Sequence, residues 1–160
     1  MLYLVLKLVH LTGVVLFLGN ISVGVFWKRY ADRTRSMAIM ASTMDAIVAA
    51  DKIFTIPGIV ILLAGGFGTA VVGQIPILAT GWLLWGLGAF ILSGVAFVPL
   101  SRIQRRISVA AHAGNAEQYE ELSRGWDFWG AIALLLPIAA FVLMILKPNL
   151  PAFHHGRSPF

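Results

Sequence analysis

Four long apolar runs dominate this chain, and each is long enough to cross a lipid bilayer. A transmembrane helix needs about 20 predominantly apolar residues, and backbone in contact with lipid must satisfy its hydrogen bonds internally, as a helix does. Hydrophobic residues make up 59% of the 160 positions, charged residues only 12%, and the mean hydropathy is +0.86. The sequence therefore predicts an all-α integral membrane four-helix bundle, with helices at 2–27, 53–73, 77–100 and 126–146.

The apolar runs fill more than half of the chain, so we expect one transmembrane domain over residues 1–147 and a short extracytoplasmic tail over 148–160. The first run has no basic segment before it and no small-residue cleavage motif after it, which favours a retained helix over a cleaved signal peptide. His154 and His155 lie in the proline-containing tail, where we expect them to be solvated or to bind metal weakly. The chain has no cysteine, which excludes disulfides and thiolate chemistry.

The basic residues predict how the helices are threaded through the membrane. Nine of the twelve lysines and arginines lie between the first and second runs or between the third and fourth. The positive-inside rule places these two connections in the cytoplasm and both termini outside, as expected for a bacterial inner-membrane protein. The net charge of +5 then favours contact with anionic inner-leaflet lipids. It does not indicate nucleic-acid binding, because no basic surface interleaved with aromatic residues is present.

Both cytoplasmic connections are predicted to be helical. Residues 36–51 place Met37, Met40 and Met44 on one face, which favours an amphipathic helix; a Cu(I) site on this face is the alternative. The third helix is expected to continue to His112. Asn115, followed three residues later by Gln118, then resembles a capping box that opens a short helix.

Prolines, glycines and tryptophans suggest details of packing within the membrane. Pro57 and Pro137 are expected to kink or locally open the second and fourth helices. The glycine-rich segment 65–68 indicates close packing of helices, or room for a flat ligand. Two tryptophan pairs are expected in the interfacial belts, with the outer pair at Trp82 and Trp85 and the inner pair at Trp126 and Trp129.

His10 is the titratable residue best placed for function, because it lies inside an apolar run. The helical period places it on a stripe that we expect to face the bundle, since the stripe also carries two glycines and an amide. Two interpretations remain open: hydrogen bonding to a neighbouring helix, or a role as a ligand or proton carrier. Lys7, one turn earlier, is expected to anchor the helix at the surface. The stripe consists of His10, Gly13, Phe17, Asn20 and Gly24.

Residues 7–10 and the aromatic, basic exit of the first helix at 26–30 resemble the opening of the HemJ-type membrane protoporphyrinogen oxidases. The CopD-like group has a related opening. The similarity continues in outline through later segments, at Asp51–Phe54, Gly81–Trp82, Glu117–Leu122 and Val142–Pro148.

Over nearly its whole length the chain resembles domain-of-unknown-function family 2269 more closely, a group of bacterial integral membrane proteins. The segments Val15–Asn20 and Phe54–Gly58 carry this resemblance. That family has no established activity, so this resemblance mainly supports the fold.

The HemJ-type resemblance implies that His10 is an axial ligand of b-type haem. Gly13, Phe17 and Asn20 would then border the cofactor. Those proteins also use a lysine on the third helix, but residues 82–100 of this chain contain no lysine or histidine. Porphyrinogen oxidation is therefore not implied, while five-coordinate haem or haem with another ligand remains open.

Met144 is the candidate for a second axial ligand, because it lies at a depth compatible with His10 and methionine can ligate haem opposite histidine. His112 lies at the wrong side of the membrane for the same iron. The leading interpretation is thus a haem- or porphyrin-binding redox protein. The alternatives are a non-catalytic accessory or assembly subunit and a small proton- or metal-coupled transporter acting as an oligomer.

Overall fold

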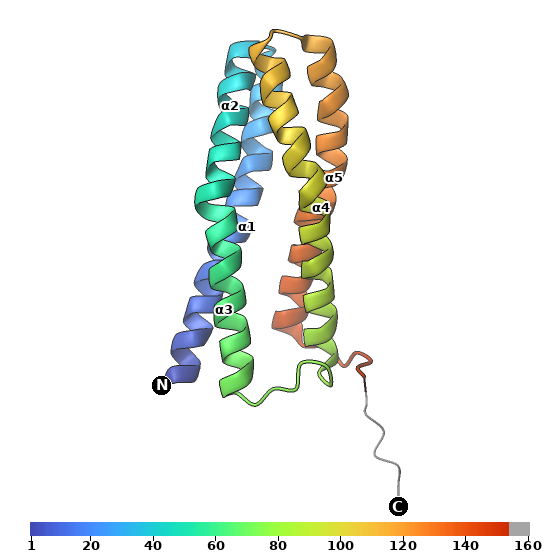
Figure 1. Cartoon of the computed structure of the whole chain (residues 1–160). Coiled ribbons are helices and arrows are strands. Elements are labelled where there is room, and N and C mark those ends of the chain that lie inside the picture. Colours follow the sequence, from blue (N-terminus) through green and yellow to red (C-terminus); the bar gives the residue numbers. More distant parts are fainter. Residues whose placement is uncertain (154–160) are drawn as a thin grey trace, which may run out of the picture.

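The computed structural model describes residues 1–153, which form four long helical rods running up and down beside one another (Figure 1). The second rod contains three consecutive segments that follow each other without a break. This arrangement confirms the predicted all-α four-helix bundle. The elements are α1 (Leu2–Thr34), α2 (Met37–Ala50), the π-helical segment η1 (Asp51–Thr55), α3 (Ile56–Val72), α4 (Gly81–His112) and α5 (Ala116–Leu146).

The rods extend well beyond the predicted apolar runs. The 33 residues of α1 correspond to a length of about 50 Å, whereas the hydrocarbon core of a bilayer is about 30 Å thick. The predicted continuation of the third helix to His112 is confirmed, although that helix begins at Gly81 and not at residue 77. Asn115 caps α5 by accepting a 3.0 Å hydrogen bond from the backbone N–H of Gln118, and α5 then continues into the fourth run.

The amphipathic helix predicted over residues 36–51 is not separate from the second apolar run, as α2 passes through η1 directly into α3. Residues 37–56 contain no glycine or proline that would end a helix. Pro57 is the second residue of α3, and because proline has no N–H it interrupts the regular backbone hydrogen bonds at this point. The π-helical turn accommodates this interruption without breaking the rod.

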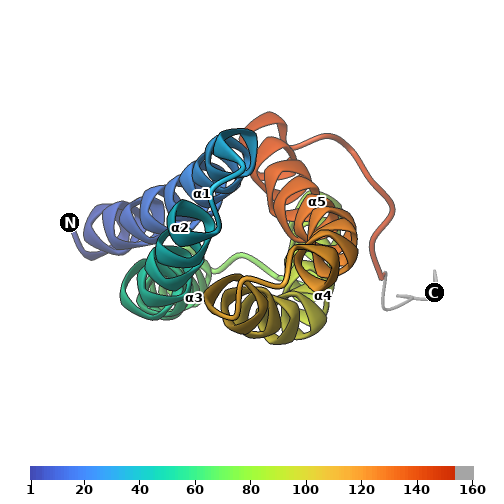
Figure 2. The same cartoon turned by 90° about the horizontal axis from the view of Figure 1, so that it is seen from above.

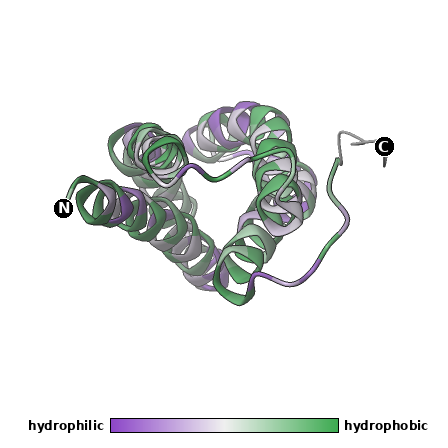
Figure 3. Ribbon diagram, turned by 90° about the horizontal axis from the view of Figure 1, so that it is seen from below, coloured by the Kyte–Doolittle hydropathy of each residue, from purple (hydrophilic) through white to green (hydrophobic). Residues whose placement is uncertain are grey.

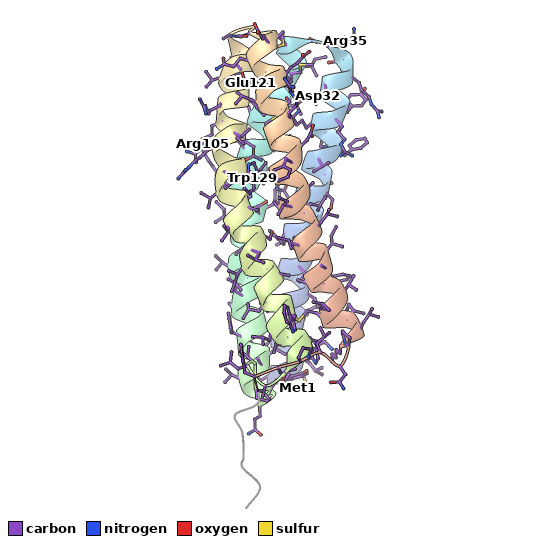
Figure 4. All side chains as sticks on the ribbon, turned by 90° about the vertical axis from the view of Figure 1, so that its right-hand side faces the viewer. Met1, Asp32, Arg35, Arg105, Glu121 and Trp129 are labelled. Carbon is purple, nitrogen blue, oxygen red and sulfur yellow. The ribbon has the colours of Figure 1, made fainter. Side chains whose placement is uncertain are left out.

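The rods form two hairpins, α1 with α2–α3 and α4 with α5 (Figures 1 and 2). We call one end of the bundle the basic end; it holds the connections 34–37 and 112–116, with Arg33, Arg35 and His112 in or beside them. The opposite end, the terminal end, holds Met1, the connection 73–80 and residues 147–153. Figure 4 shows Asp32, Arg35 and Glu121 near the basic end and Met1 at the opposite end.

The hairpins pack most closely toward the basic end. Small and flexible side chains fill the core there, and Met44 and Ile107 are completely buried. The face predicted to carry the methionines thus packs inside the bundle through Met40 and Met44. Trp126 belongs to this core as well, with 3% of its surface exposed, so its predicted place in the interfacial belt was wrong.

The exterior of the bundle is apolar over most of its length. All four rods are long and apolar enough to cross a membrane, and only 11–22% of the residues in their most apolar stretches are buried within the protein. In the view from the terminal end, hydrophobic residues colour much of the ribbon of the helices (Figure 3). Lipid contact explains this exposure, because a water-soluble bundle keeps its apolar face inside.

The first part of the tail returns to the terminal end of α4. The indole N–H of Trp85 donates a 3.0 Å hydrogen bond to the carbonyl of Pro151, and the N–H of Phe153 donates to the carbonyl of Leu78 at 3.1 Å. The predictions for His154 and His155 lie outside the described residues.

Candidate functional site

A cavity of about 370 Å³ lies between the two hairpins toward the terminal end, and we call it the terminal cavity. Its volume is within the range of sites for small molecules. Its walls are mostly apolar, with contributions from α1, α3, α4 and α5. Within residues 1–153 its polar lining includes the basic side chains of Lys7, His10 and Lys147 and the phenol of Tyr3, and it includes no Asp or Glu.

His10 is held in the wall of this cavity by a bond to α3. Its Nδ1 atom lies 2.8 Å from the carbonyl oxygen of Leu62. Because a carbonyl only accepts hydrogen bonds, Nδ1 carries a proton, and in the neutral imidazole Nε2 then keeps its lone pair. Nε2 has no hydrogen-bond partner in the described part of the chain. The bond between helices is what the packing interpretation expects, yet it also prepares Nε2 as an acceptor or a metal ligand.

Gly66 makes the His10 bond possible. A Cβ atom at Gly66 would lie 2.8 Å from Nδ1 of His10 and 3.1 Å from its Cε1, closer than real side chains approach. The imidazole therefore occupies the space that a side chain at this position would fill. The glycine-rich segment thus serves both close helix packing and the placement of the His10 imidazole.

Gly13 and Gly65 mark the closest crossing of α1 and α3. A Cβ atom at Gly13 would lie 2.7 Å from the Cα of Leu62, and one at Gly65 would lie 2.8 Å from the Cα of His10. Gly13 therefore faces the backbone of α3 and not the terminal cavity. The space beside it is filled by α3, and Gly13 is not among the residues that line this cavity.

Phe17 and Met144 do line the terminal cavity together with His10. Phe17 packs edge-on against Phe90 of α4, with ring centroids 5.5 Å apart. Met144 approaches from α5, and its Cε would lie 3.0 Å from a Cβ at Gly86, whose missing side chain makes room for it. The structure thus brings His10, Phe17 and Met144 to one cavity from different helices.

Asn20 belongs to a different site. Its amide nitrogen donates hydrogen bonds to Thr55 Oγ1 at 2.8 Å and to Asp51 Oδ1 at 3.2 Å, which join α1 to η1. Gln104 of α4 completes the cluster by donating to Asp51 Oδ2 at 3.1 Å. The predicted stripe on α1 therefore divides: His10 and Phe17 face the terminal cavity, whereas Asn20 serves this second cluster.

The Asp51 cluster lines a second cavity of about 450 Å³ nearer the basic end. We call it the acidic cavity, because Asp51 is the one charged residue in its wall within residues 1–153. Its other polar lining residues are Asn20, Ser42, Thr43 and Gln104. Sequence reasoning assigned Asp51 to a loop helix and missed this site, since partners 31 and 53 positions away leave no local pattern.

Lys28 was counted among the basic residues between the first and second apolar runs, and its burial was not predicted. Its side chain is completely buried, and its Nζ lies 2.7 Å from Asp32 Oδ2 and 3.1 Å from Ser123 Oγ. The same ammonium lies 5.2 Å from the ring centroids of Tyr119 and Trp126. The spacing of Lys28 and Asp32, four residues apart on one helix, was the available signal.

His112 lies far from the terminal cavity, at the exposed basic end. Its Nε2 is 2.7 Å from Asp45 Oδ2, and Ser108 also donates to Asp45. Asp45 precedes the apolar run at 53–73 and lies outside the membrane-spanning part of its rod. Hydrogen bonds from Ser108 and His112 lower the pKa of the Asp45 carboxyl. Within residues 1–153, no cluster of three histidine, aspartate or glutamate side chains is arranged to hold a metal ion.

Comparison with known proteins agrees with this architecture. Residues 4–148 match the sequence profile of a family described as predicted integral membrane protein (DUF2269). No curated protein and no solved structure is found to match the chain. Because the match covers nearly the whole chain, the protein belongs to the DUF2269 family of integral membrane proteins.

Proposed function

We propose that the protein binds b-type haem in the terminal cavity, with His10 Nε2 as axial ligand, and that it acts in electron transfer within the membrane. The observation that carries this proposal is the 2.8 Å bond from His10 Nδ1 to the Leu62 carbonyl. Such a bond to the far ring nitrogen orients a ligating histidine and fixes its tautomer. Bound haem would supply one-electron redox chemistry, which the side chains of this cavity cannot perform by themselves.

The residues of the terminal cavity fit this group chemically. The walls are largely apolar, as a porphyrin ring requires, and the basic lining suits the two propionate groups. Lys147 is held 5.3 Å from the ring centroid of Trp82, and Lys7 lies one helical turn from His10. Met144 lies in the wall contributed by α5 and supplies a thioether that suits haem iron.

The charge distribution supports an orientation for this site. With the basic end in the cytoplasm of a bacterial cell and against anionic lipids, the terminal cavity lies toward the outer leaflet. His10 is then about 12 Å from the start of α1. The haem would be reached from the outer half of the membrane.

A haem titration of the detergent-purified protein tests the proposal. We expect a saturable Soret band at one haem per chain, which His10→Ala abolishes and His112→Ala leaves unchanged. Met144→Leu is expected to shift the reduced α band without removing the Soret band, if the thioether is bound. A wild-type protein that stays colourless after reconstitution would exclude haem binding. His10 would then join α1 to α3 in a non-catalytic subunit, as its bond to Leu62 also permits.

A further inference from the structure

The acidic cavity has a charge that nothing in its wall balances. Asp51 lines it with only 9% of its surface exposed, and none of the cavity-lining residues within 1–153 is a lysine, arginine or histidine. The nearby ammonium of Lys28 is already paired with Asp32 at 2.7 Å. A buried ionisable side chain without a counter-charge is costly, which makes Asp51 a candidate for part of a binding site.

The hydrogen bonds around Asp51 favour its ionised form and oppose the cost of burying the charge. Asn20 and Thr55 donate to Oδ1 at 3.2 and 2.8 Å, and Gln104 donates to Oδ2 at 3.1 Å. Thr55 in turn accepts from Asn20 at 2.8 Å, so its hydroxyl hydrogen is directed to Asp51. Three donors and no acceptor match the ionised form of the acid.

The same hydrogen bonds determine which way the two amides point. Because the Asp51 carboxylate accepts from both NH₂ groups, the carbonyl oxygens of Asn20 and Gln104 remain as acceptors. Neither oxygen has a hydrogen-bond partner within residues 1–153, and both residues line the cavity. The cavity thus offers one negative charge and two neutral acceptors to an occupant.

The remaining walls favour an occupant that is partly apolar. Trp27, Phe54 and Phe97 line the cavity, and aromatic faces attract ammonium groups as well as apolar substituents. A volume of about 450 Å³ is far larger than a metal ion or a single water requires. The π-helical turn η1 that carries Asp51 is a type of irregularity often found at functional sites.

We infer that the acidic cavity is a binding site for an organic ammonium cation with an apolar substituent, and that Asp51 is its counter-charge. Asn20 and Gln104 accept hydrogen bonds from the ammonium, while the aromatic wall contacts the substituent. This inference does not depend on haem binding, because the terminal cavity is lined by different residues.

Calorimetric titration of the detergent-purified protein with benzylammonium near neutral pH tests the inference. Benzyl alcohol, which has nearly the same size but no charge, is the matched control ligand. We expect saturable binding of benzylammonium at one site per chain and at least tenfold weaker binding of the alcohol. Asp51→Asn should weaken benzylammonium binding at least tenfold, whereas Asp45→Asn, at an exposed carboxylate of the same rod, should change it less than twofold.

Three outcomes would overturn the inference. Equal binding of the alcohol by wild-type protein would show a merely apolar cavity, and this comparison holds even if Asp51→Asn does not fold. Undiminished binding to a folded Asp51→Asn variant would place the cation elsewhere. An absence of saturable binding, together with an infrared carboxyl band that Asp51→Asn removes, would identify a proton site.

Discussion

The two cavities of the bundle differ in charge and in how their polar side chains are held. The terminal cavity is lined by Lys7, His10 and Lys147, and the acidic cavity by Asp51. Asp51 is hydrogen-bonded to side chains of three elements, whereas His10 is hydrogen-bonded across helices to a backbone carbonyl. One bundle therefore separates a basic site from an acidic one along its axis, and each suits a ligand of opposite charge.

The comparison also shows where polar residues stabilise the fold. Toward the basic end, Lys28, Asp51 and Gln104 are buried and join different helices. Toward the terminal end, close glycine contacts join α1 to α3, and the basic side chains are left to face the cavity. Replacing a polar side chain should therefore lower the unfolding free energy more toward the basic end than toward the terminal end.

The largest effect is expected at Lys28. Lys28→Met removes a completely buried charge from its contacts with Asp32 and Ser123, and breaking a buried ion pair costs about 3 kcal/mol of unfolding free energy. Lys7→Met, in the same helix but at the terminal cavity, should change the unfolding free energy by less than about 0.5 kcal/mol. Denaturant unfolding in detergent measures both variants. Equal losses of unfolding free energy in the two variants would show that polar side chains stabilise both halves of the bundle to the same extent.

Asp51→Leu is expected to have the next largest effect. It leaves the amide donors of Asn20 and Gln104 without their carboxylate, which costs about 2 kcal/mol. His10→Leu removes one hydrogen bond to Leu62 and should cost about 1 kcal/mol. Thermal unfolding of the two variants ranks them, and the reverse order would contradict the structural role assigned to Asp51.

Gly66→Ala should sharpen the account of the terminal cavity with a smaller loss of stability. The added Cβ would lie 2.8 Å from His10 Nδ1, so the ring must move and its bond to Leu62 must lengthen or break. We expect a loss of about 1 kcal/mol and a change in the ¹⁵N chemical shifts of His10. Gly88→Ala is the control, because no neighbouring atom lies within 4 Å of its added Cβ. Unchanged His10 shifts in Gly66→Ala would be inconsistent with this geometry.

The smallest effect is expected at Asp45. Its pKa is lowered in the folded protein, so its bonds to Ser108 and His112 stabilise the fold above the ordinary carboxyl range. That contribution is lost as the pH falls through the lowered pKa. Because the pair is exposed, Asp45→Asn should cost less than about 0.5 kcal/mol near neutral pH. A pH series of unfolding measurements checks this, and a larger loss would mean that the basic end contributes more than exposed pairs usually do.

The helices could be predicted from the sequence because each apolar run carries its own signal of length and composition. The continuity of the second rod was missed, since Asp51 and Lys52 interrupt the apolar pattern and appear to end a segment. The interior position of Trp126 was missed as well, because tryptophan near a basic segment has the same pattern at an interface and in a core.

The candidate sites could be predicted only in part. His10 was identified because a histidine is unusual inside an apolar run. Its partner Leu62 is 52 positions away, and the bond uses a backbone carbonyl that no side-chain pattern reveals. Asn20 lies on the predicted stripe, yet the helix crossing at Gly13 and the position of η1 direct it to Asp51.

The reduced-minus-oxidised absorbance spectrum of the protein as purified from membranes tests the central claim most directly. Haem ligation by His10 predicts a Soret band with sharp α and β bands, lost in His10→Ala and retained in His112→Ala. A featureless spectrum of the folded wild-type protein, before and after addition of haem, would contradict it.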